Sequence, residues 1–240
     1  MTEPILVASG KGGVGKSTFA AGVGSCLARR GRRVLLAEAV CGFASLDLLL
    51  GLPADAVFDL ADALEGRCSL GDALRVQEES QLRLICAPVD PLYLPKEERL
   101  SDFLRWAGEN WDAVLIDCGT GFSLWHRMLA RHCPRAVLVT TPEESAARAA
   151  ARCSSLLARE GLTRQRLVID RIPGDFRPSP TVRDLDDVID LAGVQLLGAV
   201  PEHPGPLARG ELLPDDPASR ALDAIARRIL GERVELLLCP

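Results

Sequence analysis

The pattern of hydrophobic and polar positions divides the chain into two kinds of segment, which alternate along it. Short runs rich in leucine, valine and isoleucine are followed by longer stretches whose apolar residues recur every three or four positions. The short runs predict buried strands and the longer stretches predict amphipathic helices, an alternation typical of βαβ units with a parallel sheet. The expected strands lie at residues 5–8, 33–37, 82–86, 113–117, 136–140, 167–170 and 196–200.

The helices that the same pattern predicts lie at residues 17–30, 96–110, 122–131, 143–159, 182–191 and 218–230. Residues 58–76 predict two short helices interrupted at Gly66 and Gly71. No internal repeat, low-complexity tract or long linker divides the chain. The sequence therefore predicts an α/β fold with a mostly parallel, twisted sheet of about seven strands and helices on both faces, in a single domain spanning residues 1–240.

Composition points to a compartment and excludes some classes of function. The 240 residues carry a net charge of −5, which gives no support for general nucleic-acid or membrane binding. The chain start lacks the positive residues and apolar run of a signal peptide, and no apolar run is long enough to cross a bilayer. The eight cysteines are scattered without a Cys-x-x-Cys pair, as buried thiols in a reducing compartment would be. We therefore expect a cytoplasmic protein that binds neither nucleic acid nor membrane.

A glycine-rich segment between the first predicted strand and helix matches the pattern G-x-x-x-x-G-K-[ST]. Its glycines would let backbone N–H groups turn onto phosphate oxygens, and the following helix adds positive partial charge at its start. We expect Lys16 to reach the β- and γ-phosphates of a nucleotide and the Ser17 hydroxyl to bind Mg²⁺. The candidate phosphate-binding residues are Gly10, Lys11, Gly12, Gly13, Val14, Gly15, Lys16, Ser17 and Thr18.

Lysine is rare in this chain, and two of its three lysines, Lys11 and Lys16, lie in this segment, whereas arginine supplies the other cations. Such a bias indicates that the segment needs a compact ammonium group. The motif Lys-Gly-Gly-x-Gly-Lys-[ST] resembles the deviant Walker A loop of the MinD/ParA superfamily of P-loop ATPases. The resemblance implies ATP and Mg²⁺ as ligands, with Lys11 and Lys16 both catalytic. It further implies a homodimer formed on ATP binding, in which Lys11 contacts phosphate bound to the partner subunit.

Further motifs carry this resemblance along most of the chain. Residues 42–51 look like a stretch of the MinD branch, Asp117–Gly121 like the family's switch II, and residues 141–143 and 198–202 like its T-x-P-E and G-x-I-P-E motifs. By this resemblance Asp117 would join Ser17 at the metal site, through water. The implied function is a nucleotide-dependent dimerisation switch in the spatial organisation of the cell, such as placement of the division site, chromosome or flagellum, with a protein partner.

The end of the second predicted strand departs from the family. Where the family has Asp-x-Asp, this chain has Glu38-Ala39-Val40, and the resemblance assigns the second aspartate to orienting the attacking water. Val40 can neither accept a proton nor polarise water, so hydrolysis should be slow. Glu38, on the same strand face, is the candidate catalytic replacement. The alternatives are a degenerate ATP- or ADP-binding scaffold with little or no hydrolysis, and a metabolic relative such as a dethiobiotin-synthetase-like ligase.

The base-reading position departs as well. The family commonly has Asn-Arg after its sixth strand, whereas this chain has Asp170-Arg171. An ionised aspartate accepts from the adenine amino group but cannot donate to N7, and it could equally accept from guanine. Pro201 and Glu202 are further candidates for contacts to the base. ATP is the favoured nucleotide, and the choice between adenine and guanine stays open.

The remaining arginines, histidines, cysteines and the tail are interpreted as structural rather than functional. Arginines 148, 152 and 159 on one predicted helix fit a solvated face, with a partner-binding face as the alternative. His126 and His132 show no partner carboxylate or serine pattern and are assigned no chemistry. Cys41 and Cys118 are expected to be buried thiols rather than cluster ligands. The tail after Gly231 carries two glutamates and no basic face, which predicts a short edge strand rather than a membrane helix.

Overall fold

The computed structural model describes residues 1–40, 46–203 and 216–236. One sheet of eight strands runs through the molecule in the order β3-β4-β2-β5-β1-β6-β7-β8, and every neighbouring pair is parallel except β3 with β4. The predicted α/β fold with a mostly parallel sheet is confirmed. The strands are β1 Ile5–Ser9, β2 Val34–Ala39, β3 Arg75–Val76, β4 Arg83–Ile85, β5 Ala113–Thr120, β6 Arg135–Thr140, β7 Gln165–Ile172 and β8 Leu196–Pro201.

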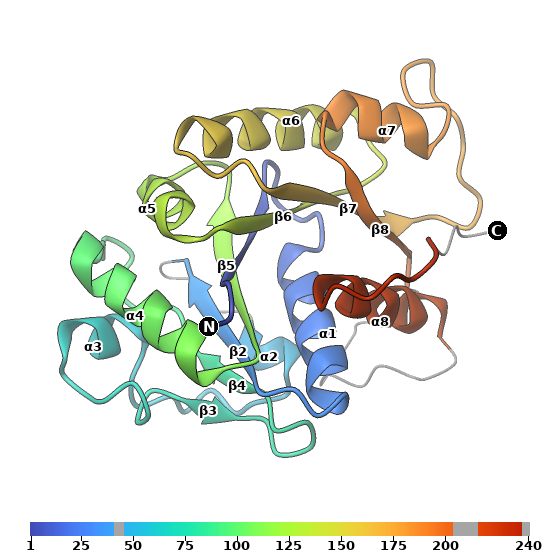
Figure 1. Cartoon of the computed structure of the whole chain (residues 1–240). Helices are drawn as coiled ribbons and strands as arrows, with labels where there is room; N and C mark the ends of the chain where they lie inside the picture. The colour runs from blue at the N-terminus through green and yellow to red at the C-terminus, as the bar shows by residue number, and fades with distance from the viewer. Residues whose placement is uncertain (41–45, 204–215, 237–240) are drawn as a thin grey trace.

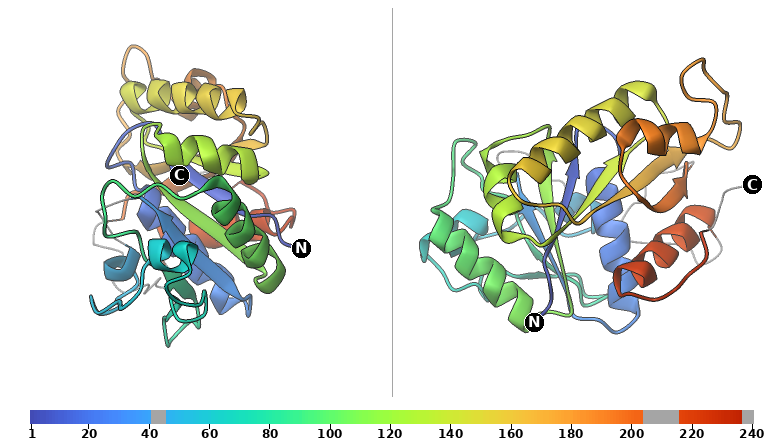
Figure 2. Two further views of the ribbon diagram at one scale, coloured as in Figure 1. Left: turned by 90° about the vertical axis from the view of Figure 1, so that its left-hand side faces the viewer. Right: turned by 45° about the horizontal axis from the view of Figure 1, so that its top comes forward.

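Helices cover both faces of the sheet (Figure 1), and Figure 2 shows the two helical layers from two further directions. The side chains of α1, α2 and α8 pack in one apolar core, and those of α3 to α7 pack in the other, except for Ala146 at the start of α6, which joins the first. Adjacent residues of β1 divide between the cores, since Leu6 lies in one and Val7 in the other. Burial on both faces explains why the strands are continuous apolar runs. The helices are α1 Lys16–Arg29, α2 Leu46–Leu49, α3 Leu60–Glu65, α4 Glu97–Asn110, α5 Leu124–His132, α6 Glu144–Arg159, α7 Leu185–Ala192 and α8 Pro217–Ile229.

The segment 58–76 differs from its prediction. It forms one helix, α3, which Asp59 and Asp62 begin with reciprocal side-chain bonds to backbone N–H groups. Gly66 ends this helix in the left-handed region at φ 71°. Beyond Gly71 the chain forms the two-residue strand β3 instead of a second helix, antiparallel to β4. The prediction of a second helix was therefore wrong, because pairing with the next strand, β4, outweighs local helix propensity there.

The tail also differs from its prediction over its described part. Residues 232–236 form neither the expected strand nor a helix, and residues 237–240 lie outside the described residues. The Arg228 side chain donates to the carbonyl of Val234 at 3.0 Å and to that of Glu235. The same guanidinium donates to the carbonyl of Leu197 in β8 at 3.0 Å. One arginine side chain, rather than a backbone ladder, thus ties the tail to the sheet.

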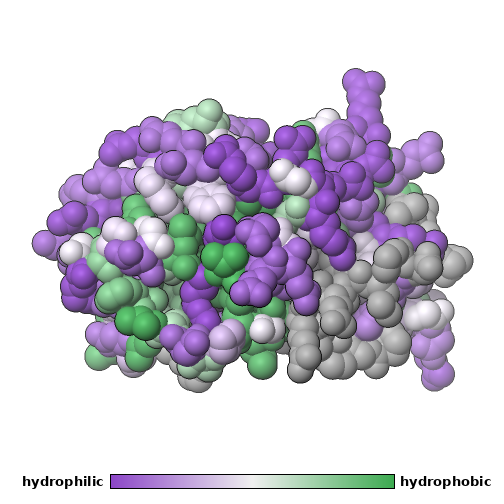
Figure 3. All heavy atoms as spheres, turned by 90° about the horizontal axis from the view of Figure 1, so that it is seen from below, coloured by the Kyte–Doolittle hydropathy of each residue, from purple (hydrophilic) through white to green (hydrophobic). Residues whose placement is uncertain are grey.

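The surface seen from below the view of Figure 1, where β3 lies, is a mosaic of hydrophilic and hydrophobic residues (Figure 3). Among the described residues, the exposed large apolar side chains include Leu48, Val57 and Leu92. Apolar residues scattered over a surface are ordinary in folded proteins. In the part of the chain that the structure describes, no helix is both long and apolar enough to span a bilayer.

Candidate functional site

The glycine-rich segment forms the loop between β1 and α1 and requires glycine at several points. Gly13 and Gly15 have φ of 77° and 87°, a region that L side chains rarely adopt. A Cβ atom on Gly10 would lie 2.0 Å from the Ala149 carbonyl oxygen, and one on Gly15 would lie 1.8 Å from an Asp170 carboxylate oxygen. Val14 is buried, and Lys16, Ser17 and Thr18 form the first turn of α1. The backbone of the loop is thus held close to α6 and to the end of β7.

Lys16, Ser17 and Asp117 form one polar cluster, in which Lys16 and Asp117 are buried and Ser17 is half-buried. The Lys16 Nζ lies 2.5 Å from Asp117 Oδ1, and Ser17 Oγ donates to Asp117 Oδ2 at 2.6 Å. The Lys16 side chain is 8% exposed and that of Asp117 is 1% exposed. The adjoining strands β1 and β5 place them together, because Asp117 pairs in register with Val7, just before the loop. The sequence predictions for these three residues thus converge at one point.

A hydroxyl and a carboxylate side by side offer the oxygen ligands that Mg²⁺ prefers. Among the described residues no group of three or more His, Cys, Asp or Glu side chains could hold a metal ion by itself. Ser17 and Asp117 therefore fit a magnesium site of the kind that also needs phosphate oxygens and water.

Lys11 lies elsewhere, on the rim of the loop. Its Nζ donates to Glu143 Oε2 at 2.7 Å and to Ser145 Oγ at 3.0 Å. Its side chain remains 43% exposed. Both partners come from the start of α6, within the same chain. The two lysines of the motif thus face different surroundings, one buried against a carboxylate and the other on the protein surface.

Glu38 is completely buried and is the register partner of Asp117 on the neighbouring strand. Its carboxylate nevertheless accepts from the backbone N–H of Leu46 at 2.9 Å and from that of Ala87 at 3.2 Å. These bonds fasten the start of α2 and the end of β4 to β2. Glu38 has a structural task that its sequence position did not reveal, and a part in hydrolysis stays a prediction.

Val40, directly after β2, lies against switch II. Its γ2 methyl is the nearest atom to the space beside the Gly119 Cα, 3.3 Å from where a Cβ would stand. Gly119 is two residues after Asp117 on β5. The position at which the resemblance expects a carboxylate therefore lies against β5, two residues along from Asp117, and it carries methyl groups.

A cavity of about 640 Å³ opens on the outer side of the loop. Arg171, which has φ 57°, donates from its guanidinium to the Gly13 carbonyl at 2.7 Å and lines this cavity. Glu202, after β8, lines it as well, together with two residues that the sequence analysis missed, Pro173 and Phe176. The only signal for them was one aromatic ring in a proline-rich loop after a strand. An aromatic face and a proline beside a phosphate loop suit a nucleobase.

Asp170 lies beneath the loop and is 8% exposed. Burial raises the pKa of its carboxyl from 3.8 to about 6. It is not among the residues that line the 640 Å³ cavity, and Pro201 is likewise absent from that lining. Asp170 therefore does not line the cavity that suits a nucleobase, and its reading of the base remains a prediction.

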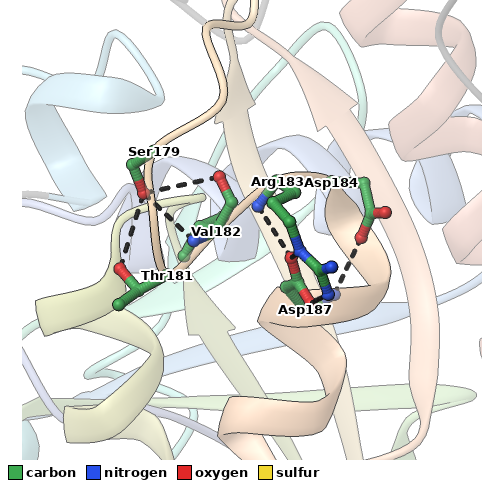
Figure 4. A network of polar contacts seen from close by, with 6 residues as sticks. All are labelled: Ser179, Thr181, Val182, Arg183, Asp184 and Asp187. Atoms are coloured by element: carbon green, nitrogen blue, oxygen red, sulfur yellow. Dashed lines mark hydrogen bonds and ion pairs between the residues drawn. The ribbon is translucent and has the colours of Figure 1, made fainter.

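The loop between β7 and α7 is held by a polar network (Figure 4). Ser179 Oγ bonds the backbone N–H of Val182 at 3.0 Å, and Arg183 contacts Asp187 through two bonds of 2.8 and 2.9 Å. Those bonds lower the pKa of Asp187 to about 2. Thr181 donates to Glu144 at 2.5 Å, next to the glutamate that binds Lys11. The wall carrying Phe176 is thus fixed to the start of α6.

The two histidines have partners after all. His126 Nδ1 accepts from the backbone N–H of Ser123 at 3.1 Å and lies 3.0 Å from its hydroxyl. His132 Nε2 lies 3.2 Å from Glu97. The sequence pattern did not reveal these partners, because Ser123 precedes the helix by one position and Glu97 is distant in sequence. That neither histidine carries chemistry stays a prediction. Cys118 is a fully buried thiol with a raised pKa, as expected, whereas Cys41 lies outside the described residues.

Comparison with known proteins extends these observations. Residues 5–206 match the family model described as the CobQ/CobB/MinD/ParA nucleotide binding domain. The chain is 35% identical over 246 residues to the septum site-determining protein MinD of Bacillus subtilis, with 98% of this chain and 92% of that protein covered. It is 32% identical to MinD of Synechocystis, with 99% and 92% covered. The resemblance stated from the motifs is confirmed.

Solved structures agree with this assignment. The MinC:MinD cell division protein complex of Aquifex aeolicus matches with a TM-score of 0.90, at 30% identity and with 99% of both chains covered. MinD of Pyrococcus horikoshii, complexed with Mg-ADP, matches with a TM-score of 0.81 at 26% identity, with 95% and 96% covered. The expected P-loop nucleotide-binding fold is confirmed.

Proposed function

This chain belongs to the CobQ/CobB/MinD/ParA nucleotide-binding family, and we propose that it is an ATP-dependent dimerisation switch with slow hydrolysis that acts in septum placement or related spatial organisation. The observation that carries the proposal is the separation of the two loop lysines. Lys16 is buried beside Asp117 and serves the chain's own nucleotide, whereas Lys11 is on the exposed rim. An ammonium on the rim is available to a phosphate bound to a second copy.

Binding of Mg·ATP rearranges the buried cluster. Lys16 leaves Asp117 and donates to the β- and γ-phosphates, while loop N–H groups turn onto the phosphate oxygens. The Ser17 hydroxyl, and Asp117 through water, would hold Mg²⁺, and the metal would supply neutralisation of charge on the phosphates. Lys11 leaves Glu143 and Ser145 as the dimer forms, at little cost, because exposed ion pairs contribute only ~0–1 kcal/mol.

Slow hydrolysis follows from the valine at position 40. Phosphoryl transfer depends on positioning the attacking water and on stabilising charge. The methyl groups of Val40 beside Gly119 can do neither. The protein would then hold ATP, and the dimer, for longer than a relative with a carboxylate there.

A second function is favoured by the contacts of Glu38. Its carboxylate is bonded to the N–H groups of Leu46 and Ala87, so freeing it for a water molecule would leave two buried donors unpaired. On this account the protein is an ATP- or ADP-binding scaffold with little or no turnover.

Single-turnover hydrolysis of Mg·ATP, with analytical ultracentrifugation of the same samples, separates these functions. A slow but measurable turnover with dimers that decay as ATP is consumed supports the switch. Stable binding without turnover supports the scaffold. Failure to bind Mg·ATP at all would overturn both.

The partners belong to the same proposal. An Aquifex relative is recorded in a MinC:MinD complex, and we infer a protein partner here as well. We expect the protein in the cytoplasm, without nucleic-acid binding. Absence of membrane binding stays a prediction from the acidic tail.

A further inference from the structure

A second cavity, of about 230 Å³, lies at the end of the sheet opposite the phosphate loop. Its walls come from the amino ends of strands, since Ile5 and Arg135 are the first residues of β1 and β6 and Arg166 is the second of β7. Four of its lining residues are arginines, and none is acidic: Arg135, Arg164, Arg166 and Arg228. Ile5, Val137, Leu197 and Ile229 add an apolar lining.

Arg135 is poorly satisfied in this cavity. Its side chain is 30% exposed, and its buried Nε has no hydrogen-bond partner. The nearest acidic oxygen, Glu3 Oε2, is 3.3 Å from Nε, and the guanidinium reaches the Ile229 carbonyl only at 3.4 Å. Burial, together with the nearby charge of Arg164, lowers the pKa of Arg135. A guanidinium that has lost water without gaining good partners has capacity for an anion.

The charge around the cavity is not balanced by the described contacts. Glu3 bonds Arg164 at 2.7 Å as well as pairing with Arg135, and its side chain is 43% exposed. Arg228 and Arg166 donate to backbone carbonyls, which carry no net charge. Four guanidinium groups and one carboxylate leave an excess of three positive charges, in a chain whose net charge is −5. Such concentrated charge raises the local concentration of anions.

We propose that this cavity binds an oxyanion of the phosphate class, at a site separate from the nucleotide. Planar guanidinium groups match the oxygens of phosphate with paired bonds. The volume exceeds that of one water, about 30 Å³, by several fold, and the apolar lining limits competition from solvent. A phosphate dianion would lower the local excess charge from three to one and give the Arg135 Nε an acceptor in hydrogen-bonding geometry, which Glu3 does not provide.

Free phosphate and a phospholipid headgroup both carry the phosphate oxyanion, so either could be the source of the ligand. We expect free phosphate, because the described tail beside Arg228 contains Glu232 and Glu235 and forms no amphipathic helix. Two arms of one experiment distinguish the sources.

The first arm is calorimetric titration of inorganic phosphate into protein saturated with Mg·ATPγS, which fills the phosphate loop. Wild type should show saturable binding, and Arg166→Gln and Arg135→Gln should weaken it by about tenfold or more, as loss of a charge-assisted bond does. Arg105→Gln is the matched control, because Arg105 pairs with Asp102 on exposed α4. Arg166 is exposed, so its variant decides the result even if Arg135→Gln fails to fold.

The second arm is flotation with vesicles of phosphatidylglycerol or of phosphatidylcholine, with the same variants. We expect no recovery in either lipid fraction. Recovery with phosphatidylglycerol alone that Arg166→Gln removes would keep the site and assign it to a headgroup. The proposal is overturned if the loaded wild type binds neither probe, or if binding is unchanged in both arginine variants.

Discussion

Lys16 and Asp117 form a buried ion pair, with 2.5 Å between Nζ and Oδ1, at the point where a nucleotide phosphate would bind. The pair joins the start of α1 to β5, residues a hundred positions apart in sequence. Because the lysine must leave the carboxylate to reach phosphate, the same side chain links nucleotide binding to the position of switch II.

Lys16→Ala should abolish detectable Mg·ATP binding, since a charged donor to two phosphates is lost at a cost of ~2–4 kcal/mol. Isothermal titration calorimetry measures the affinity. Lys96→Ala, which removes the chain's third lysine at the exposed start of α4, is the matched control. Circular dichroism checks that the variant with an unpaired Asp117 still folds, and unchanged affinity in a folded variant would refute the site.

Lys11 should matter for assembly rather than for binding by the monomer. We expect Lys11→Ala to keep nucleotide affinity within a few-fold, because its contacts to Glu143 and Ser145 are exposed and contribute little. ATP-dependent dimers should disappear in analytical ultracentrifugation. Glu143→Gln separates the two ends of the contact, since it removes the charge opposite the lysine while keeping the lysine, and it should leave dimers intact. Normal dimers of Lys11→Ala would show that the lysine does not act across an interface.

Asp170 should make stability depend on pH in a defined direction. Its pKa is raised by burial from 3.8 to about 6, so the folded state favours the protonated form. The resulting loss of stability is absent below about pH 4, grows as the pH rises from 4 to 6, and is complete above 6. Asp170→Asn should therefore raise the free energy of unfolding at pH 7.5 by on the order of 2 kcal/mol, and by much less at pH 4.

Urea denaturation at the two pH values measures this difference. Asp102→Asn, on the exposed face of α4, is the control and should change stability by only a few tenths of a kcal/mol at either pH. Equal effects of Asp170→Asn at pH 4 and 7.5 would mean that folding does not shift the pKa of this carboxyl. Affinity for ATP and GTP measured on the same variant tests whether position 170 reads the base.

Features set by a local motif or by pairing of neighbouring strands could be predicted from the sequence, whereas contacts between separate connecting segments could not. Lys16 and Ser17 lie in a local motif between a strand and a helix, and Asp117 lies on β5, the strand that flanks β1, so their convergence followed from parallel pairing. The partners of Glu38 could not be predicted, because Leu46 and Ala87 belong to different crossovers. Phe176 was missed because its place depends on how the loop after β7 returns to the phosphate loop. The strand β3 was missed because two residues are too few to show an alternating pattern.

Val40 decides between a slow enzyme and an inert scaffold. If the missing carboxylate is the only defect, Val40→Asp should raise single-turnover hydrolysis by at least about tenfold, which needs only ~1.4 kcal/mol of transition-state stabilisation. The substitution is conservative in placement, because Val40 already lies against Gly119 beside Asp117. Val40→Asn, similar in size and without the charge, is the control and should give no such gain.

Glu38→Gln is measured in parallel. It keeps the shape but leaves an amide facing one of the two backbone donors, so it should reduce stability while leaving the slow rate of the folded protein unchanged. Brisk hydrolysis by wild type that Glu38→Gln eliminates would instead make Glu38 the water-orienting residue.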